Sequence, residues 1–196
     1  MTFTKNMKAA ILCFIICSII SIQRSYSQAT TPPNIIIILA DDMGYSDIGS
    51  YGSDIPTPNI DALANNGLRF TNFYNMARCS PTRASILTGL TPHMAGMGKL
   101  AERTIGLNTK NEEGYLGYLN NESVTLAEVL KPAGYKTIIS GKWHLGMRDK
   151  SKWPLQRGFD KFYGLLSGSA SYFKPTKEKG YASGNNLLDP PTNPDY

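Results

Sequence analysis

Hydrophobic and polar positions along the chain predict an alternation of strands and helices. Residues 34–39 (NIIIIL) form a continuous, largely β-branched apolar run, the kind buried on both faces of a parallel sheet. Residues 135–140 (YKTIIS) form a second run of this kind, and residues 68–74 alternate like a third strand. Each of the two buried-type runs leads directly into a polar segment that contains glycine. Two strands are therefore predicted to end next to polar side chains.

Three helices are predicted between and around these strands. Residues 57–67 and 80–89 each open with Thr-Pro or Ser-Pro, an N-cap followed by the first helical position, and each ends at a glycine. Residues 125–134 open with a capping box made by Thr125 and Glu128 and also end at a glycine. The second of these helices places Cys79 just before a helix N-terminus.

Strands that alternate with helices indicate an α/β fold, a mostly parallel (mixed) sheet flanked by helices. Residues 91–122 carry many glycines and no clear period, so we expect a long surface excursion there. From residue 167 onward Gly, Ser, Asn and Pro dominate, and no strand or helix is predicted. We expect the chain to stop inside its domain, leaving the sheet incomplete at the C-terminus.

Composition and charge narrow the class of protein. A chain of 196 residues with 41% hydrophobic and 18% charged residues is neither disordered nor collagen-like. The net charge of +5 suggests a polyanionic partner at first. However, three of the basic residues lie in residues 1–27, which contain no acid, and the remainder is nearly balanced. We therefore expect no nucleic-acid partner, which would require clustered basic residues.

The first residues have the layout of a secretory signal. Lys5 and Lys8 precede the almost wholly apolar run 9–22, and small residues follow it. A membrane anchor is the alternative, but the run is shorter than the roughly 20 apolar residues that span a bilayer. We expect residues 1–27 to be a signal peptide, residues 28–33 a linker, and the protein to be exported to the periplasm or the extracellular medium without a stable membrane anchor. Cleavage would leave Cys79 as the single cysteine.

Two adjacent carboxylates follow the first predicted strand. Asp41 and Asp42 form a hard oxygen site of the kind that suits Ca²⁺ or Mg²⁺, although Asp-Asp-x-Gly is also good turn chemistry. Lys142 and His144 follow the second buried-type strand, two residues apart, so in an extended segment they point to one side. They could instead be solvated loop residues. Ligands of such sheets bind beyond the carboxyl ends of the strands, so we expect both pairs in one crevice.

The segment CSPTR (79–83) carries a nucleophile at a helix N-terminus. Unpaired backbone N–H groups and the helix dipole favour negative charge there, which attracts anions and lowers a thiol pKa. Arg83, about one turn along, can direct its guanidinium to the same place. The alternatives are a buried structural cysteine and a surface arginine. Together, a cation site, an anion-binding helix end, a nucleophile and two further cationic side chains describe a site for a tetrahedral anionic ester.

These residues resemble a known family, the type I sulfatases, within the wider alkaline-phosphatase-like superfamily. Four blocks carry the resemblance, in the order found in the family: LADDMGYSDIGSYG (39–52), TPNIDALANNGLRFTNFY (57–74), CSPTRASILTG (79–89) and GYKTIISGKWHLG (134–146). The Cys-x-Pro-x-Arg core is highly specific. The segment GYLGYLNNESVTLAEVL is most similar to bacterial arylsulfatases. The resemblance implies that residues 34–196 are the N-terminal part of a sulfatase catalytic domain.

The resemblance implies a cofactor and a modified nucleophile. In the family the cysteine of this motif is oxidised to formylglycine by a maturation enzyme, and the aldehyde hydrate attacks sulfur. Cys79 would be the precursor, and Pro81 and Arg83 belong to the sequence that the maturation enzyme reads. Asp41 and Asp42 match ligands of Ca²⁺, with Mg²⁺ as the alternative, and the modified Cys79 would also contact the metal.

The resemblance also implies roles for the cationic side chains. Arg83 matches the residue that stabilises the aldehyde hydrate, Lys142 a sulfate-binding residue, and His144 a residue that binds the hydrate and assists its breakdown. The expected substrate is a sulfated small molecule or glycan. His93 is assigned a structural role, and Thr82 is a mild departure from the family pattern.

The larger departure is length, since the family's second half supplies further metal ligands and a leaving-group acid. The chain by itself is therefore expected to be inactive. A phosphate or phosphonate monoester hydrolase of the same superfamily and a catalytically silent remnant are the alternative functions.

Overall fold

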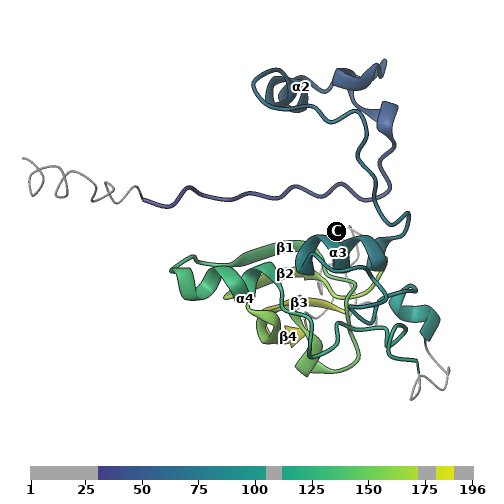
Figure 1. The fold of residues 1–196 in the computed structure, drawn as a ribbon, viewed down its shortest axis with the longest axis vertical. Coiled ribbons are helices and arrows are strands. Elements are labelled where there is room, and N and C mark those ends of the chain that lie inside the picture. The colour runs from purple at the N-terminus through teal and green to yellow at the C-terminus, as the bar shows by residue number, and fades with distance from the viewer. Residues whose placement is uncertain (1–30, 105–111, 172–179, 188–196) are drawn as a thin grey trace, which may run out of the picture. The chain divides into compact units, whose positions relative to one another are not determined.

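A computed structural model describes residues 31–104, 112–171 and 180–187, and the chain divides into two units, residues 1–40 and 41–196 (Figure 1). The predicted signal peptide 1–27, with Cys13 and Cys17, lies outside the described residues, as does most of the predicted linker 28–33. Among the described residues no helix has the length and apolar character needed to cross a membrane.

In the first unit, residues 31–40 are extended but form no strand, so the strand predicted at 34–39 is wrong for the described structure (Figure 1). The isoleucines are exposed, with Ile36 at 82% and Ile38 at 81%. An apolar run of this type becomes a strand when neighbouring strands satisfy its backbone and cover both faces. No strand among the described residues pairs with it. The apolar run 34–39 is therefore not part of a sheet among the described residues.

The second unit is built on a four-stranded mixed sheet, which confirms the predicted α/β class. Its strands are β1 (Ile138–Lys142), β2 (Lys161–Leu165), β3 (Tyr181–Ser183) and β4 (Asn186–Leu187), in that spatial order. β1 and β2 are parallel, with Ile138 opposite Lys161 and Lys142 opposite Leu165. The other two pairings are antiparallel. β3 and β4 lie where no strand is predicted, because short strands among Gly and Asn residues leave no periodic signal.

Close approach of β1 and β2 depends on a glycine. A Cβ atom at Gly164 would lie 2.0 Å from the carbonyl oxygen of Gly141, and Gly164 also has a φ of +150°. Any side chain at this position would force the strands apart. The pairing that leads β1 to its end at Lys142 therefore requires glycine in β2.

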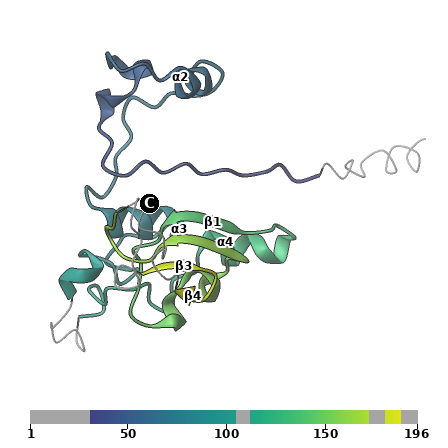
Figure 2. The same ribbon diagram turned by 180° about the vertical axis from the view of Figure 1, so that it is seen from behind.

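Two helices lie on one face of this sheet: α3 (Cys79–Thr88) and α4 (Leu126–Leu130) (Figures 1 and 2). Ala84 on α3 and Ala127 on α4 are fully buried and belong to the hydrophobic core. The predicted capping box of α4 is present, since Thr125 Oγ1 accepts from the Glu128 N–H and the Glu128 carboxylate accepts from the Thr125 N–H. A 3₁₀ turn η5 (Lys131–Ala133) ends at Gly134, as predicted, in the left-handed conformation.

Helix α3 begins two residues earlier than the sequence pattern predicts. Its N-cap is Arg78, so Cys79 is the first helical residue and Ser80 the second. Pro81 is tolerated because the first turn needs no N–H donor there. Ser80, predicted to be the cap, is fully buried, and its Oγ accepts from the Ala101 N–H at 3.3 Å. Gly89 ends the helix in the left-handed conformation, as predicted.

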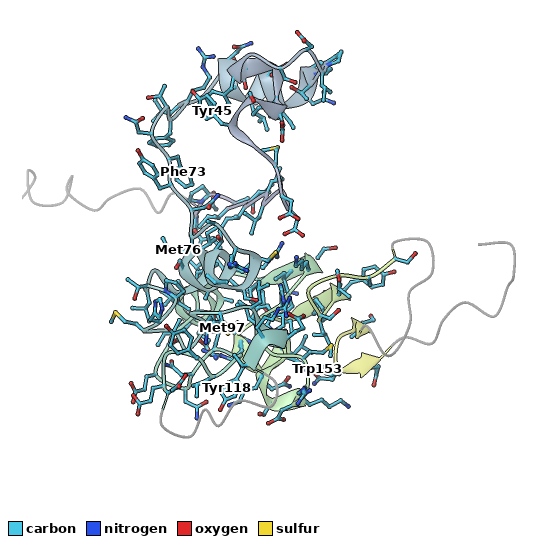
Figure 3. The ribbon with its side chains drawn as sticks, turned by 90° about the vertical axis from the view of Figure 1, so that its right-hand side faces the viewer. Tyr45, Phe73, Met76, Met97, Tyr118 and Trp153 are labelled. Carbon is cyan, nitrogen blue, oxygen red and sulfur yellow. The ribbon has the colours of Figure 1, made fainter. Side chains whose placement is uncertain are left out.

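The interior of this unit is formed around Trp143, which packs edge-on against Phe159 with ring centroids 6.1 Å apart. Met97 and Trp153 are part of the same core and are labelled in Figure 3. Two 3₁₀ turns, η6 (Lys150–Lys152) and η7 (Pro154–Arg157), lead from this region to β2.

The segment 91–122, predicted to be a surface excursion, contributes side chains to the core. Met97 and Leu119 are buried, and Met97 forms a β-bridge with Tyr115. The 3₁₀ turn η3 (Ala101–Thr104) also belongs to this excursion. Apolar residues spaced irregularly among glycines carry no helix or strand period, so the sequence pattern did not reveal their burial.

Residues 44–70 form a small substructure of η1 (Tyr45–Asp47), η2 (Gly49–Tyr51) and α2 (Pro58–Asn65). Helix α2 confirms the predicted helix, and Asp61 on it accepts from the Ser50 N–H at 2.6 Å. Its apolar side chains Ile60 and Leu63 remain exposed. The strand predicted at 68–74 is wrong, because this segment pairs with no strand of the described chain and its aromatic side chains are exposed.

Candidate active site

Asp41 contacts both Lys142 and Arg83, so side chains that follow two different predicted strands meet a side chain of a predicted helix. Its Oδ2 accepts from Lys142 Nζ at 2.8 Å, and its Oδ1 accepts from Arg83 Nη2 at 3.3 Å. Arg83 Nη1 also donates to the carbonyl oxygen of Lys142. Arg83 is 9% exposed, so little water competes for these bonds. One guanidinium on α3 therefore ties the carboxylate at 41 to the end of β1.

The nucleophile candidate lies at the same place. The Cys79 thiol and the carboxylates of Asp41 and Asp42 each offer an atom within 4.8 Å of the other two. Cys79 is half-buried at the first position of α3, where backbone N–H groups lack helical partners. Two carboxylates at this spacing fit a hard divalent cation.

The charges around Asp41 perturb one another. Partial burial alone would raise the pKa of Asp41, but the bonds from Lys142 and Arg83 together lower it below its ordinary value. Burial alone would likewise lower the pKa of Lys142, but Asp41 and the Cys79 thiol together raise it. The carboxylate therefore stays ionised and the amine protonated, which keeps the positive charge of Lys142 beside the thiol.

Backbone strain is concentrated near this cluster. Among the described residues, the non-glycine residues with positive φ are Asp42 (55°), Ala77 (55°) and His144 (59°). Two of them are predicted site residues, and the third lies two positions before Cys79. A left-handed conformation costs an ordinary residue about 1–2 kcal/mol and persists when the surroundings enforce it. The fold therefore holds these side chains in directions that relaxed backbone would not give them.

His144 has a partner that sequence analysis missed. Its Nε2 lies 2.7 Å from Glu102 Oε2, and its ring is 3% exposed. The hydrogen bond with His144 is the main reason that the pKa of Glu102 is lowered to about 2. Glu102 lies on η3, in an excursion without periodicity, so only its proximity in space reveals the pair.

The structure thus brings together five of the six predicted site residues: Asp41, Asp42, Cys79, Arg83 and Lys142. The expectation of an extended segment through His144 is wrong, because its φ of 59° turns the chain after Lys142. Arg83, predicted to face an anion, instead donates to two protein oxygens. His93, expected to be structural, contacts Tyr115, with Nε2 and the phenol oxygen 3.1 Å apart.

Comparisons with known proteins place the chain among sulfatases. The family model described as Sulfatase matches residues 33–192. An arylsulfatase of Klebsiella aerogenes is 43% identical over 143 residues, which cover 72% of this chain and 30% of that protein. Human arylsulfatase A is 44% identical over 137 residues, 68% of this chain and 25% of that protein. The chain therefore spans less than a third of the length of these relatives.

Solved structures that match this chain also include sulfatases. The crystal structure of Ps i-CgsB in complex with k-i-k-neocarrahexaose superposes with a TM-score of 0.61 at 38% identity, covering 72% of this chain and 30% of that one. A sulfatase of Bacteroides thetaiotaomicron, from a study of glycosaminoglycan metabolism, gives a TM-score of 0.59 at 28% identity, covering 81% of this chain and 32% of that one. The fold is thus the alkaline-phosphatase-like fold of these enzymes, and the chain belongs to the sulfatase family.

Proposed function

We propose that the protein containing this chain hydrolyses sulfate esters, with Cys79 as the precursor of its nucleophile. The observation that carries the proposal is the cluster in which Cys79, at the first position of α3, lies beside two carboxylates and beside Lys142. A tetrahedral monoanionic ester needs positive charge on its oxygens and a nucleophile in line with sulfur. Family membership and arylsulfatase relatives favour sulfate over other anions.

The cationic side chains suit an anionic substrate. Lys142 is held by Asp41 with its amine protonated, so it can attract a sulfate oxygen without losing its position. Arg83 fixes Asp41 and the end of β1 from inside the fold. The unpaired N–H groups of the first turn of α3 add further positive potential beside Cys79.

Asp41 and Asp42 would hold a Ca²⁺ ion, with Mg²⁺ as the alternative. One oxygen of each carboxylate and the Cys79 sulfur lie within 4.8 Å of one another, and the two carboxylate oxygens are the hard ligands that such an ion prefers. When bound, the ion supplies a Lewis acid for a sulfate oxygen, and formylglycine at position 79 supplies a hydrate as nucleophile. The Asp41 carboxylate, ionised by its cationic neighbours, is ready to bind a metal without first losing a proton.

The remaining proposals concern partners and location. A maturation enzyme would oxidise Cys79 within the segment 79–83, converting its CH₂–SH group to an aldehyde, with an external oxidant such as dioxygen supplying the oxygen and the sulfur leaving as sulfide. The protein would be exported by residues 1–27, and its substrate would be a sulfated small molecule or glycan.

Turnover of aryl esters tests the activity directly. The protein purified from its native host, where maturation can occur, should release 4-nitrophenol from 4-nitrophenyl sulfate, and the Cys79→Ala variant should not. Parallel reactions with 4-nitrophenyl phosphate and a phosphonate monoester compare the other esters of this superfamily. Preference for phosphate or phosphonate would replace the sulfatase proposal, and wild-type protein without any turnover would favour a catalytically silent role.

A further inference from the structure

Glu102, on η3, and His144, two residues after Lys142, form a pair whose geometry goes beyond the proposed function. Glu102 Oε2 lies 2.7 Å from His144 Nε2, and Glu102 Oε1 accepts from the Gly168 N–H at 2.9 Å. The carboxylate is thus fixed at both oxygens, by a side chain and by a backbone group. Because Glu102 is ionised, with a pKa lowered to about 2 mainly by the bond with His144, it can only accept this bond.

The other ring nitrogen of His144 has no partner. Nδ1 is buried and makes no hydrogen bond with any described residue, although the ring is 3% exposed. A buried polar atom without a partner is unfavourable, and a catalytic role is one of the reasons for which native proteins keep such an atom. Since Nε2 carries its proton toward Glu102, neutral His144 presents Nδ1 as an acceptor.

Neighbouring residues restrict the positions of the Glu102 and His144 side chains. A Cβ atom at Gly168 would lie 2.6 Å from His144 Cε1 and Nε2 and 2.9 Å from Glu102 Oε1. A side chain at position 168 would therefore have to displace the ring and the carboxylate of the pair. On the other side, the Ala101 N–H donates to the buried Ser80 Oγ, so the turn that carries Glu102 is tied to the first turn of α3, next to Cys79. His144 itself holds a φ of 59°, a conformation that its surroundings must enforce.

We propose that Glu102 is the positioning residue of His144: it holds the ring with the proton on Nε2 and leaves Nδ1 to exchange a proton with a group bound at the Cys79 site. The proposal rests on the proposed function, because it names the side chain that orients His144, the histidine to which the family resemblance gives a role in breakdown of the hydrate. A carboxylate that accepts from one ring nitrogen selects the tautomer and the orientation of the other.

Kinetics of Glu102 variants of the protein made in its native host give the first test. Glu102→Leu removes both the charge and the acceptor, and loss of such a partner costs roughly 10–100-fold in activity. We expect this loss in kcat, with KM changed little, because the residue acts through His144 and does not touch the ester. Glu102→Gln should lose less, because its amide oxygen can still accept from Nε2. Glu122→Gln, at an exposed glutamate in the turn before α4, is the matched control.

Two further measurements keep the proposal falsifiable if the Leu variant folds poorly. Gly168→Ala keeps both Glu102 and His144 in the sequence but should lower kcat, because the added methyl group would displace their side chains. In ¹⁵N-histidine-labelled wild-type protein, with the His144 resonances assigned by their absence in His144→Gln, neutral His144 should carry its proton on Nε2.

A proton on Nδ1, or a Glu102→Leu variant with wild-type kcat, would overturn the proposal. Loss of thermal stability in Glu102→Leu with unchanged kcat for the folded fraction would also overturn it, in favour of a structural role. Wild-type protein without sulfate ester turnover would overturn the proposed function, whereas the tautomer measurement would still decide the role of Glu102.

Discussion

Replacing Arg83 with lysine tests the link between α3, Asp41 and the end of β1. The guanidinium donates to the Lys142 carbonyl through one nitrogen and to Asp41 Oδ1, 3.3 Å away, through another. A lysine amine is one nitrogen and cannot occupy both positions. One charge-assisted bond is then lost, which is worth about 1.5–3 kcal/mol where water cannot replace it. The Arg83 side chain is only 10% exposed, so we expect the free energy of unfolding to fall by about 2 kcal/mol.

We expect kcat of Arg83→Lys to fall by more than the loss of folding stability alone would cause. Asp41 keeps Lys142 as a partner but loses the contact that fixes it to α3, so the carboxylate and Cys79 are no longer held together. Loss of one preorganised polar group at a reacting centre typically costs about 10²–10³ in kcat. The assays are urea unfolding and turnover of 4-nitrophenyl sulfate, with Arg148→Lys, an exposed arginine, as the control. Unfolding energy and kcat both equal to wild type in Arg83→Lys would refute this reasoning.

Three further changes test other parts of the structure. The pKa of Asp160 is lowered to about 2, chiefly by Lys131. Its contribution to stability is therefore present above its ordinary pKa of 3.8 and is lost as the pH falls toward 2. In urea unfolding, the difference in free energy of unfolding between wild type and Asp160→Asn should shrink across that window. Ala77→Gly should raise the melting temperature, because glycine adopts the φ of 55° without the roughly 1–2 kcal/mol penalty, whereas a lower melting temperature would contradict the strain. Gly164→Ala should lower it, because the methyl group would collide with the Gly141 carbonyl, and an unchanged value would argue against the close approach of β1 and β2.

Local signals in the sequence predicted the helices well. Thr125 and Glu128 specify a helix start through two hydrogen bonds that any chain with this spacing can make. Glycines 89 and 134 end α3 and η5 in the left-handed conformation, which is a property of the residue itself. Such features depend on a few neighbouring residues, so they can be predicted without knowledge of the fold.

Strands were predicted less well because they depend on distant partners. Residues 34–39 have the composition of a buried strand, but no described strand pairs with them. Conversely, β3 forms in a segment without periodicity because it pairs with the edge of β2, and β4 then pairs with β3. Strand formation is therefore a property of the sheet as much as of the segment.

In the candidate site, too, some residues could be predicted from local signals, whereas others depend on distant parts of the chain. Asp41 and Lys142 are 101 positions apart, yet both follow predicted strands, and they meet with 2.8 Å between carboxylate and amine. The expectation that side chains beyond strand ends share a crevice was useful even though the first strand is absent. Glu102 could not be predicted, because its role depends only on where η3 lies relative to His144.

The chemical state of residue 79 tests the central claim most directly. Trypsin cleavage after Arg78 and Arg83 should release the peptide 79–83 from protein purified from its native host, and its mass can be measured. The account predicts a peptide in which the CH₂–SH group has become an aldehyde, with sulfur and two hydrogens lost and one oxygen gained. A fully unmodified cysteine in protein that hydrolyses sulfate esters would contradict the role assigned to Cys79.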